Sequence, residues 1–600
     1  MQFFQILQPA DCSAHYFFTV RRESIMKKKV IVIIIAIVAI VLVLAIGFGK
    51  QLFEEYSYSK EEADLSEYFG LSDGEMAIVL QNDTLVSKAI KEGEEVYIPL
   101  DTVNEKIGEG FYYDPSYNSG TLMFTTADGT YETAPGSSAC TLEGIEENLG
   151  YVASTVKDGE LYVSTKYISR FMQASFEVYD KHIRVATMGG DFDAREVSSD
   201  TQIRVEGDKA SPFIREVKEG ETVELVEAMD EWSRVVTSDG FTGFIENKRL
   251  KDAGAGSYEA ALAPDISETA FNLLGERVVL GFNSIAGLGG NDTVYGALDE
   301  AKGMNVIAPT WFSVTGADGS IRNLGSSSYV QTAHSSGVKV WAVADDFNYR
   351  NESGDTSFND LDFLSNTVSR RNLENNLVNA CVALGVDGLN IDFEKLYTEC
   401  GVHYAQFIKE LSVLTHKNGL VLSTDNYVPF SYNEFYRLDV QGGFVDYVLI
   451  MGYDEHYHGS GDIGSVASFD YVCSGMDKTM QYVAPERIIN AVPFYTIVWK
   501  DEGSTISDSY LTLVNQAEYI SKYNISYEWD EATCQNYAEW KSGTTTYHVW
   551  FEDSESLTAK LNAMNTRNIG GVGVWRIGYG TPEVWNLIGM YKNMKTESTN

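Results

Sequence analysis

The sequence predicts an α/β protein: a C-terminal (β/α)8 TIM barrel, preceded by a small all-β barrel, a duplicated α+β stalk module and one transmembrane helix. Three observations carry this prediction. Eight β-rich runs alternate with longer mixed segments in the C-terminal half. Short β-rich runs with Gly and Asp-Gly turns precede them, and an uncharged stretch lies near the N-terminus. Six hundred residues exceed one hydrophobic core, so several domains are expected.

The uncharged stretch, residues 30–48, follows the basic run "MKKK". It is long enough to span a bilayer, and the sequence after it poorly matches the small-x-small exit of a cleaved secretory signal, so we expect an uncleaved anchor. The positive-inside rule makes 1–29 a cytoplasmic tail and places the rest outside the cell membrane. Met26 is a more natural start than Met1, because residues 1–25 show neither periodicity nor a targeting pattern.

Composition excludes two classes of function. A formal charge of -41, from 86 acidic and 45 basic residues, argues against a nucleic-acid-binding surface. Six cysteines show neither metal-ligand spacing nor a disulfide framework.

Residues 49–190 contain a weak internal repeat, in which 96–114 resembles 161–180. Each copy is typical of a short strand, a helical stretch and an aromatic strand ending in Asp, which predicts two similar lobes. The pattern resembles the stalk module named after the N-terminal domain of copper amine oxidases. No copper is expected, because the segment offers no His cluster.

Residues 198–252 predict a small barrel of closely spaced strands. They resemble a bacterial Src-homology-3-type domain at Trp232, Asp239, Gly240, Gly243 and Phe244. Binding of the cell wall or a peptide and a plain spacer role are both open for this domain. Ala and Gly then predict a flexible linker over 253–270, before the barrel over 271–595.

The predicted barrel strands are 277–283, 305–312, 338–345, 387–394, 420–427, 445–453, 488–495 and 571–577. The longest gap lies between the seventh and eighth runs, which predicts an insertion there. In the fourth run, Asn390, Asp392 and Glu394 recur at every second position, roughly 6.6 Å apart, so they share the face that lines the barrel. Glu394 reaches the carboxyl end, where barrel enzymes keep their active sites. Acidic residues at strand ends also cap helices, so the pair alone does not decide the function.

The whole octet "DGLNIDFE" resembles the signature of glycoside hydrolase family 18. Met451 to Asp454, the segment Val492 to Trp499, and Trp575 resemble its sixth-, seventh- and eighth-strand motifs. The resemblance implies a retaining mechanism assisted by the substrate. Glu394 is the implied general acid and later base, Asp392 holds the acetamido N–H of the sugar, and Tyr453 binds the acetamido carbonyl. Substrate contacts are implied at Asn390, Asp454, Tyr495 and Trp575, with no metal or other cofactor.

Many members of that family carry Asp at the position of Asn390. An amide there removes one charge from a crowded row, and we expect its N–H to donate to Asp392. The substitution Asn390→Asp is then expected to keep activity and to shift the pH profile.

The polymer is predicted from three features. The segments 453–468 and 549–561 resemble the branch of the family that contains spore-cortex and cell-wall lytic N-acetylglucosaminidases. An anchor and a wall-associated module favour peptidoglycan as the substrate, beside the cell's own wall. Hydrolysis of chitin or of N-glycans, and a non-catalytic glycan-binding barrel, remain as alternatives.

Overall fold

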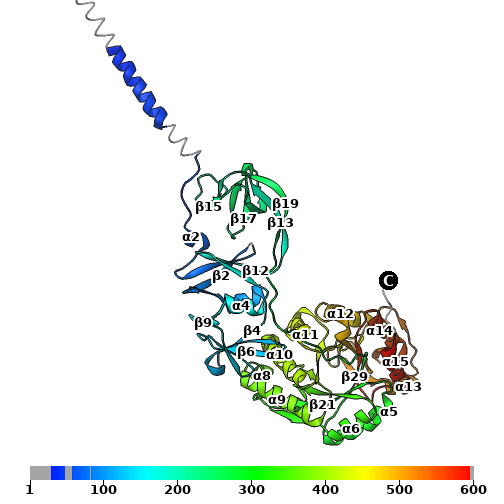
Figure 1. Ribbon diagram of the computed structural model, residues 1–600. Coiled ribbons are helices and arrows are strands. Elements are labelled where there is room, and N and C mark those ends of the chain that lie inside the picture. Colours follow the sequence, from blue (N-terminus) through cyan, green and yellow to red (C-terminus); the bar gives the residue numbers. More distant parts are fainter. Residues whose placement is uncertain (1–28, 48–56, 82, 595–600) are drawn as a thin grey trace, which may run out of the picture. The chain divides into compact units, whose positions relative to one another are not determined.

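The computed structural model describes residues 29–47, 57–81 and 83–594 (Figure 1). Beyond the N-terminal helix it divides into two compact units, which are taken in turn below. The first comprises 57–98 and 173–263, and the second 99–172 and 264–594. The predictions about the cytoplasmic tail and Met26 lie outside the described residues.

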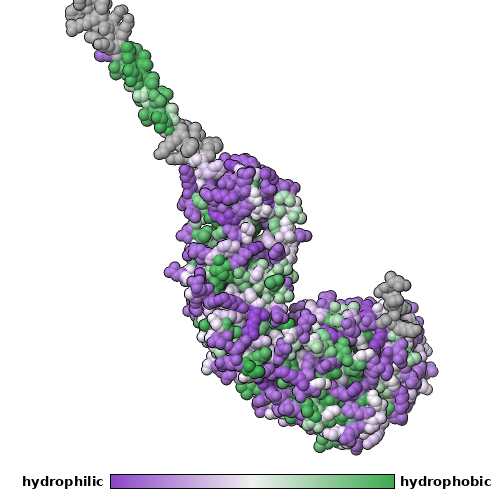
Figure 2. Space-filling view, viewed as in Figure 1, coloured by the Kyte–Doolittle hydropathy of each residue, from purple (hydrophilic) through white to green (hydrophobic). Residues whose placement is uncertain are grey.

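The N-terminal helix spans Lys29–Gly47 and is apolar after Lys29 (Figure 2). Nineteen residues at about 1.5 Å each give a length close to the ~30 Å of a bilayer's hydrocarbon core. A membrane span and a signal sequence share these features.

The first unit contains a short helix, α2 (Leu65–Phe69), and strands from two sheets. One series runs in the order β11-β12-β1-β2-β3, with the bounds Ser175–Val178, His182–Ala186, Glu75–Leu80, Asp83–Glu92 and Glu95–Pro99. The second sheet has the order β15-β14-β18-β17-β16-β13-β19, with the bounds Phe213–Val217, Thr201–Arg204, Thr242–Glu246, Trp232–Thr237, Thr222–Ala228, Gly190–Val197 and Leu250–Tyr258. All pairs in the second sheet are antiparallel, as expected for a small β module.

The segment just before α2 lies along the edge of this second sheet. The Phe213 amide, at the start of β15, donates to the Glu61 carbonyl over 2.9 Å, and the Ala63 amide donates back to Phe213 over 2.8 Å. The Tyr58 ring lies 5.3 Å from the Arg204 guanidinium, a cation–π contact. The segment is therefore held by the small β module.

The linker predicted for 253–270 begins later than expected. Residues up to Tyr258 belong to β19 and pair with β13, so the prediction is wrong for 253–258. The Ala and Gly residues that suggested a flexible linker instead allow β19 to pack closely. A Cβ at Gly256 would lie only 2.4 Å from the Phe192 ring, so only glycine fits beside that ring.

The second unit contains the predicted barrel. Eight parallel strands close in the order β20-β21-β23-β24-β25-β26-β27-β33, which confirms the fold class. Their bounds are Val278–Asn283, Val306–Val314, Lys339–Asp345, Gly388–Asp392, Val421–Tyr427, Tyr447–Met451, Ile488–Pro493 and Gly571–Trp575. Strand β22 (Ile321–Asn323) adds to β21 in antiparallel orientation.

Helices surround these strands (Figure 1). They are α5 (Val294–Glu300), α6 (Ser327–Ser335), α7 (Asn348–Ser353), α8 (Asp360–Leu364), α9 (Thr367–Leu384), α10 (Gly401–Lys417), α11 (Leu438–Phe444), α12 (Phe469–Thr479), α14 (Ser554–Thr566) and α15 (Pro582–Met590). The barrel interior is a packed core: Trp341 from β23 lies against Tyr447 from β26, with ring centroids 5.3 Å apart. Gly388 makes room for that Trp341 ring, since a Cβ there would lie 2.6 Å from it.

The predicted insertion lies between β27 and β33. It is a five-stranded sheet, β29-β28-β32-β31-β30, with one helix, α13 (Leu513–Tyr523). The strand bounds are Ile506–Thr512, Tyr495–Asp501, Thr545–Phe551, Gln535–Ser542 and Glu528–Asp530. It has a small core of its own around Val549 and Phe551.

Residues 99–172 carry a separate five-stranded sheet, β4 to β8 (Phe111–Asp114, Thr121–Thr126, Gly129–Thr133, Ala139–Leu142 and Ile145–Asn148). This stretch also contains α3 (Leu100–Thr102), β9 (Ser154–Lys157), β10 (Glu160–Ser164) and α4 (Thr165–Phe171). The sheet packs on α9 and α10 of the barrel through buried polar contacts. Arg370 of α9 bonds Glu410 of α10 over 2.7 Å and the Tyr112 hydroxyl of β4 over 3.2 Å. The neighbouring Arg371 bonds Glu132 of β6 over 2.6 Å. The sheet is thus an integral part of the second unit.

Arg370→Met is expected to destabilise this unit strongly. Arg370 is fully buried, and its loss would leave the buried carboxylate of Glu410 with only the longer ion pair to Arg371, at 3.2 Å, at a cost of about 3–5 kcal/mol in unfolding free energy. Burial raises the pKa of Glu410, but Arg370 and Arg371 outweigh that effect and hold the pKa at about 2. The stabilisation is therefore present above the ordinary range of a carboxyl and is lost as the pH falls toward 2.

Urea unfolding of the full chain measures this effect. The matched control is Arg567→Met, which breaks the partly exposed pair with Asp477 and should cost at most about 1 kcal/mol. Equal losses for the two variants would contradict the buried network.

Candidate active site

The polar row of β24 lies inside the barrel at its carboxyl end. Asn390 and Asp392 are buried within the strand, and Glu394 follows two residues after its end. In the register of the sheet, Asn390 lies opposite Ser423 of β25, and Asp392 lies opposite Asp345 of β23. The neighbouring strands therefore place further polar groups around the row.

The partner expected for Asn390 is wrong. Its Nδ2 donates to the Ser423 hydroxyl over 3.0 Å and to Asp425 Oδ1 over 2.8 Å, which uses both amide hydrogens. Asp392 therefore does not receive the expected bond. The reason is that side chains on adjacent strands lie nearer to one another than residues two apart on the same strand. Within the described residues, Asn390 Oδ1 and Asp392 Oδ1 are buried without a hydrogen-bond partner.

Asp392 lies in a group of desolvated carboxyls. Burial raises its pKa well above the ordinary value, and the nearby charges of Glu394, Asp425 and Asp345 raise it further. Burial likewise raises the pKa of Asp425 to about 8, although the bond from Asn390 acts in the opposite direction. Because like charges so close together cannot all ionise, this group retains protons near neutral pH.

Glu394 is held from several sides. Asp346, which directly follows β23, accepts the backbone N–H groups of Glu394 and Lys395 over 2.9 and 2.8 Å. On its side chain, Oε2 accepts the Tyr427 hydroxyl over 2.5 Å. Burial raises the pKa of Glu394, the bond from Tyr427 lowers it, and the charge of Asp454 raises it. The net direction is upward, which suits a group that donates a proton.

A second set of predicted residues follows β26. Tyr453 is 7% exposed, and its ring meets Tyr495 edge to face with centroids 6.3 Å apart. Burial and the charge of Asp454 raise the pKa of Tyr453 well above its ordinary value, so it stays a hydroxyl donor. Asp454 accepts the Tyr495 hydroxyl over 2.5 Å. The charge of Glu394 acts on Tyr453 as well, which brings both sets into one centre.

Trp575 ends β33 at the same face of the barrel. It is half-buried and lies against Phe282 of β20, with ring centroids 5.5 Å apart. An aromatic face at this mouth is suited to stacking on a sugar ring.

Four polar residues at this centre were missed in the sequence: Asp345, Asp346, Asp425 and Tyr427. A signal was present. The run 420–427 has the same two-residue alternation as β24, and it places Ser423, Asp425 and Tyr427 on one face. The run 338–345 ends in an acid at the carboxyl end of its strand.

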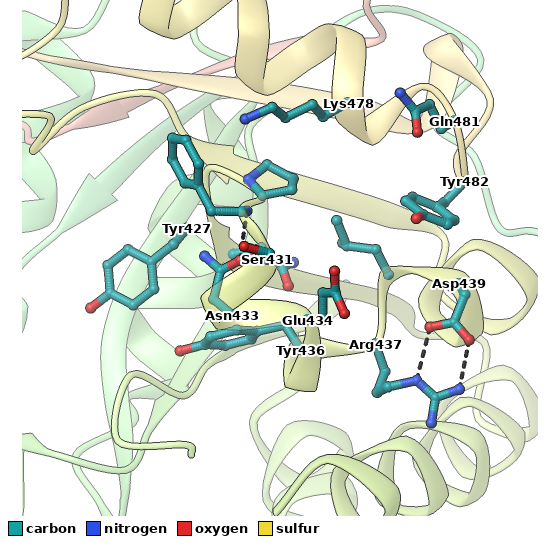
Figure 3. Close-up of a pocket in the computed structure, with 14 residues that line it drawn as sticks. Tyr427, Ser431, Asn433, Glu434, Tyr436, Arg437, Asp439, Lys478, Gln481 and Tyr482 are labelled. Carbon is teal, nitrogen blue, oxygen red and sulfur yellow. Dashed lines mark hydrogen bonds and ion pairs between the residues drawn. The ribbon is translucent and has the colours of Figure 1, made fainter. Parts of the chain in front are cut away.

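A cavity of about 500 Å³ lies beside Tyr427 (Figure 3). It is lined mainly by the loop after β25, the 3-10 helix η6 (Ser431–Tyr436) and the end of α12. Lys478 lies over the Phe430 ring here, 3.7 Å from its centroid. Of the residues that line it, Tyr427 also contacts Glu394, so the cavity adjoins the carboxyl group without containing it. Within the described ranges, no three His, Cys, Asp or Glu side chains form a group that could hold a metal ion.

Asn390→Asp is expected to shift the pH profile of the rate to higher pH without abolishing activity. A carboxyl at 390 would face Asp425 at the present 2.8 Å contact, so the two must share a proton. The extra charge on ionisation would raise the pKa values of Asp392 and Glu394 and shift the profile to higher pH. The measurement is the rate from pH 4 to 9 with the full chain. A folded variant with no turnover at any of these pH values would contradict the expectation.

Residues 326–580 match the family model described as Glycosyl hydrolases family 18. The cortical fragment-lytic enzyme of Bacillus anthracis is 26% identical over 222 residues, 36% of this chain and 51% of that protein. The cortical fragment-lytic enzyme of Bacillus subtilis (strain 168) is 27% identical over 236 residues, 38% of this chain and 54% of that protein. The chain thus spans about half the length of these curated relatives. The solved structure of the Bacillus cereus spore cortex-lytic enzyme SleL has a TM-score of 0.47 at 19% identity, over 57% of this chain and 78% of that one.

Proposed function

We propose, from the premise that the C-terminal barrel is a family 18 glycosyl hydrolase domain, that this chain is a membrane-anchored extracellular enzyme. It hydrolyses glycans that contain β-linked N-acetylglucosamine, with peptidoglycan as the substrate. The observation that carries the proposal is the convergence of Glu394, Asp392 and Tyr453 at the carboxyl end of the barrel, with the family match over the same residues.

Glu394 is the proposed general acid. Its raised pKa increases the protonated fraction at any given pH, and the bonds from its backbone to Asp346 orient the carboxyl group. In the proposed first step, Glu394 protonates the glycosidic oxygen while the acetamido oxygen of the sugar attacks the anomeric carbon. The C–O bond to the leaving sugar breaks, and an oxazolinium ion forms. Glu394 then takes a proton from water, which attacks the anomeric carbon and reopens the ring with net retention.

Asp392 and Tyr453 are proposed to guide the acetamido group. The buried Oδ1 of Asp392 is unpartnered among the described residues and is suited to accept the acetamido N–H. The Tyr453 hydroxyl would donate to the acetamido carbonyl. Asp454 and Tyr495 are proposed contacts for sugar hydroxyls, Trp575 for the ring face, and Asn390 a supporting amide.

Peptidoglycan is favoured over other polymers by the N-terminal apolar helix. As a membrane anchor, it would hold the barrel beside the cell's own wall, and the two Bacillus relatives are named for cortical fragments. The β13–β19 module is proposed to be a Src-homology-3-type domain that binds the wall. The stalk over 49–190, with its repeat split between the two compact units, is proposed as a spacer.

The test uses the full chain in detergent with purified peptidoglycan, chitin oligosaccharides and an N-glycan in parallel. New reducing ends from peptidoglycan alone, or first, would support the proposal. Release only from chitin or the N-glycan would show that peptidoglycan is not the substrate. Retention on the glycan without any release would indicate a binding protein.

A further inference from the structure

We propose that Tyr427 is a positioning residue that assigns the transferable proton to one oxygen of Glu394, and that β25 is therefore a second functional strand of the centre. This inference rests on the proposed function. It concerns a residue outside the octet of β24, on the neighbouring strand.

Different residues hold the backbone and the side chain of Glu394. Asp346 holds the N–H groups of Glu394 and Lys395, and the Tyr436 hydroxyl of η6 donates to the Phe393 carbonyl over 2.9 Å. These contacts fix the loop. Within the part of the chain that the structure describes, the side chain that hydrogen-bonds the carboxyl group itself is Tyr427, at Oε2.

Tyr427 is in turn positioned by its strand and by a ring contact. It is the last residue of β25, and its ring packs edge to face on Tyr436, with centroids 6.0 Å apart (Figure 3). Burial raises its pKa, and the charge of Glu394 raises it further, so the phenol stays protonated and acts as a donor.

A chemical consequence follows. A carboxylic acid carries its proton on either oxygen, but only one oxygen faces the bond to be cleaved. Because Oε2 is occupied as an acceptor of the Tyr427 hydroxyl, the proton of Glu394 is directed to Oε1. When Glu394 has given up that proton, the same bond stabilises the resulting carboxylate. Tyr427 thus both selects the donating oxygen and favours proton release.

Other residues of β25 also bond the polar row of β24. Asp425 and Ser423 precede Tyr427 on the same face of β25 and hold the Asn390 amide. The row of β24 and the row of β25 are therefore bonded at two levels, Asn390 to Asp425 and Glu394 to Tyr427. Tyr427, Asp454, Lys395 and Asp345 act electrostatically on Glu394. Asp392, Asp425 and Tyr453 also interact with its charge.

The experiment compares Tyr427→Phe with the wild type. Loss of the bond should move the alkaline limb of kcat/KM to higher pH by about one unit, because the carboxylate loses a stabilising donor. At the optimum, kcat should fall about tenfold or more while KM changes little, since the proposed role of the Tyr427 hydroxyl is to bond Glu394 and not the substrate. The control is Tyr482→Phe, which removes a hydroxyl from a half-exposed tyrosine of the same cavity.

A second readout works without turnover. Infrared titration of the full chain in detergent, with the carboxyl band assigned by its loss in Glu394→Gln, follows the protonation of Glu394 directly. The band should titrate at higher pH in Tyr427→Phe than in the wild type. In Tyr482→Phe it should titrate at the wild-type pH. A limb and a band that stay in place in Tyr427→Phe would overturn the proposal. If the wild type releases no reducing ends, the proposed function fails, and the infrared shift still decides the contact between Tyr427 and Glu394.

Discussion

Glu394→Gln is expected to reduce the release of reducing ends from glycan by about 10²- to 10⁴-fold, the usual contribution of a general acid. Glutamine keeps the shape of the side chain and an oxygen that accepts the Tyr427 hydroxyl, so the fold should persist. What is lost is the proton for the leaving oxygen and the base for water. Rates at the wild-type optimum, with circular dichroism of both proteins, measure the effect.

The comparison for this variant is Glu434→Gln. Glu434 also lies near Tyr427, at the cavity of Figure 3, but the proposed mechanism does not use it. It should retain wild-type rates. A Glu394→Gln protein that is folded and within about threefold of the wild type would remove Glu394 from the role of acid.

Asp392→Asn is expected to have opposite effects on activity and stability. Asparagine at position 392 cannot give up a proton and become a carboxylate when the oxazolinium charge forms, so kcat should fall by about 10²- to 10³-fold. The same change should raise the unfolding free energy by about 1–2 kcal/mol at neutral pH, since burial raises the pKa of Asp392.

The sign of the stability effect follows from that pKa. Above pH 4 the unfolded chain releases the proton of Asp392 and the folded chain keeps it, so wild-type stability falls as pH rises toward the folded pKa. The gain in Asp392→Asn should therefore grow from pH 4 upward, as measured by urea unfolding at several pH values. A gain that does not change with pH, or full activity with the higher stability, would contradict this account.

Much of the barrel could be predicted because each strand has its own local pattern in the sequence. Each predicted strand overlaps the strand in the structure, and the insertion before β33 lies in the longest gap. The partner of Asn390 was not predictable in the same way. It depends on the register of β24 against β25, which pairs Asn390 with Ser423 across the sheet, whereas the alternation along one strand suggested Asp392.

The upstream modules show a second limit. The repeat predicted strand, helical stretch and strand in both copies, and the structure has this order in 96–114 and 161–178. Nothing local indicates that the compact units divide at Ile98 and Met172, inside that repeat. The C-terminal end of β19 was also missed. Gly256 was taken as a sign of flexibility, but its missing side chain makes space for Phe192.

The most direct test of the central claim is the chemical identity of the ends that the full chain creates in purified peptidoglycan. Reduction with borohydride followed by mass spectrometry distinguishes a new N-acetylglucosamine end from a new N-acetylmuramic acid end. Proton NMR during the first turnovers reports the anomer. We predict N-acetylglucosamine ends that first appear as the β-anomer, absent with Glu394→Gln. N-acetylmuramic acid ends, an initial α-anomer, or no new ends at all would contradict the account.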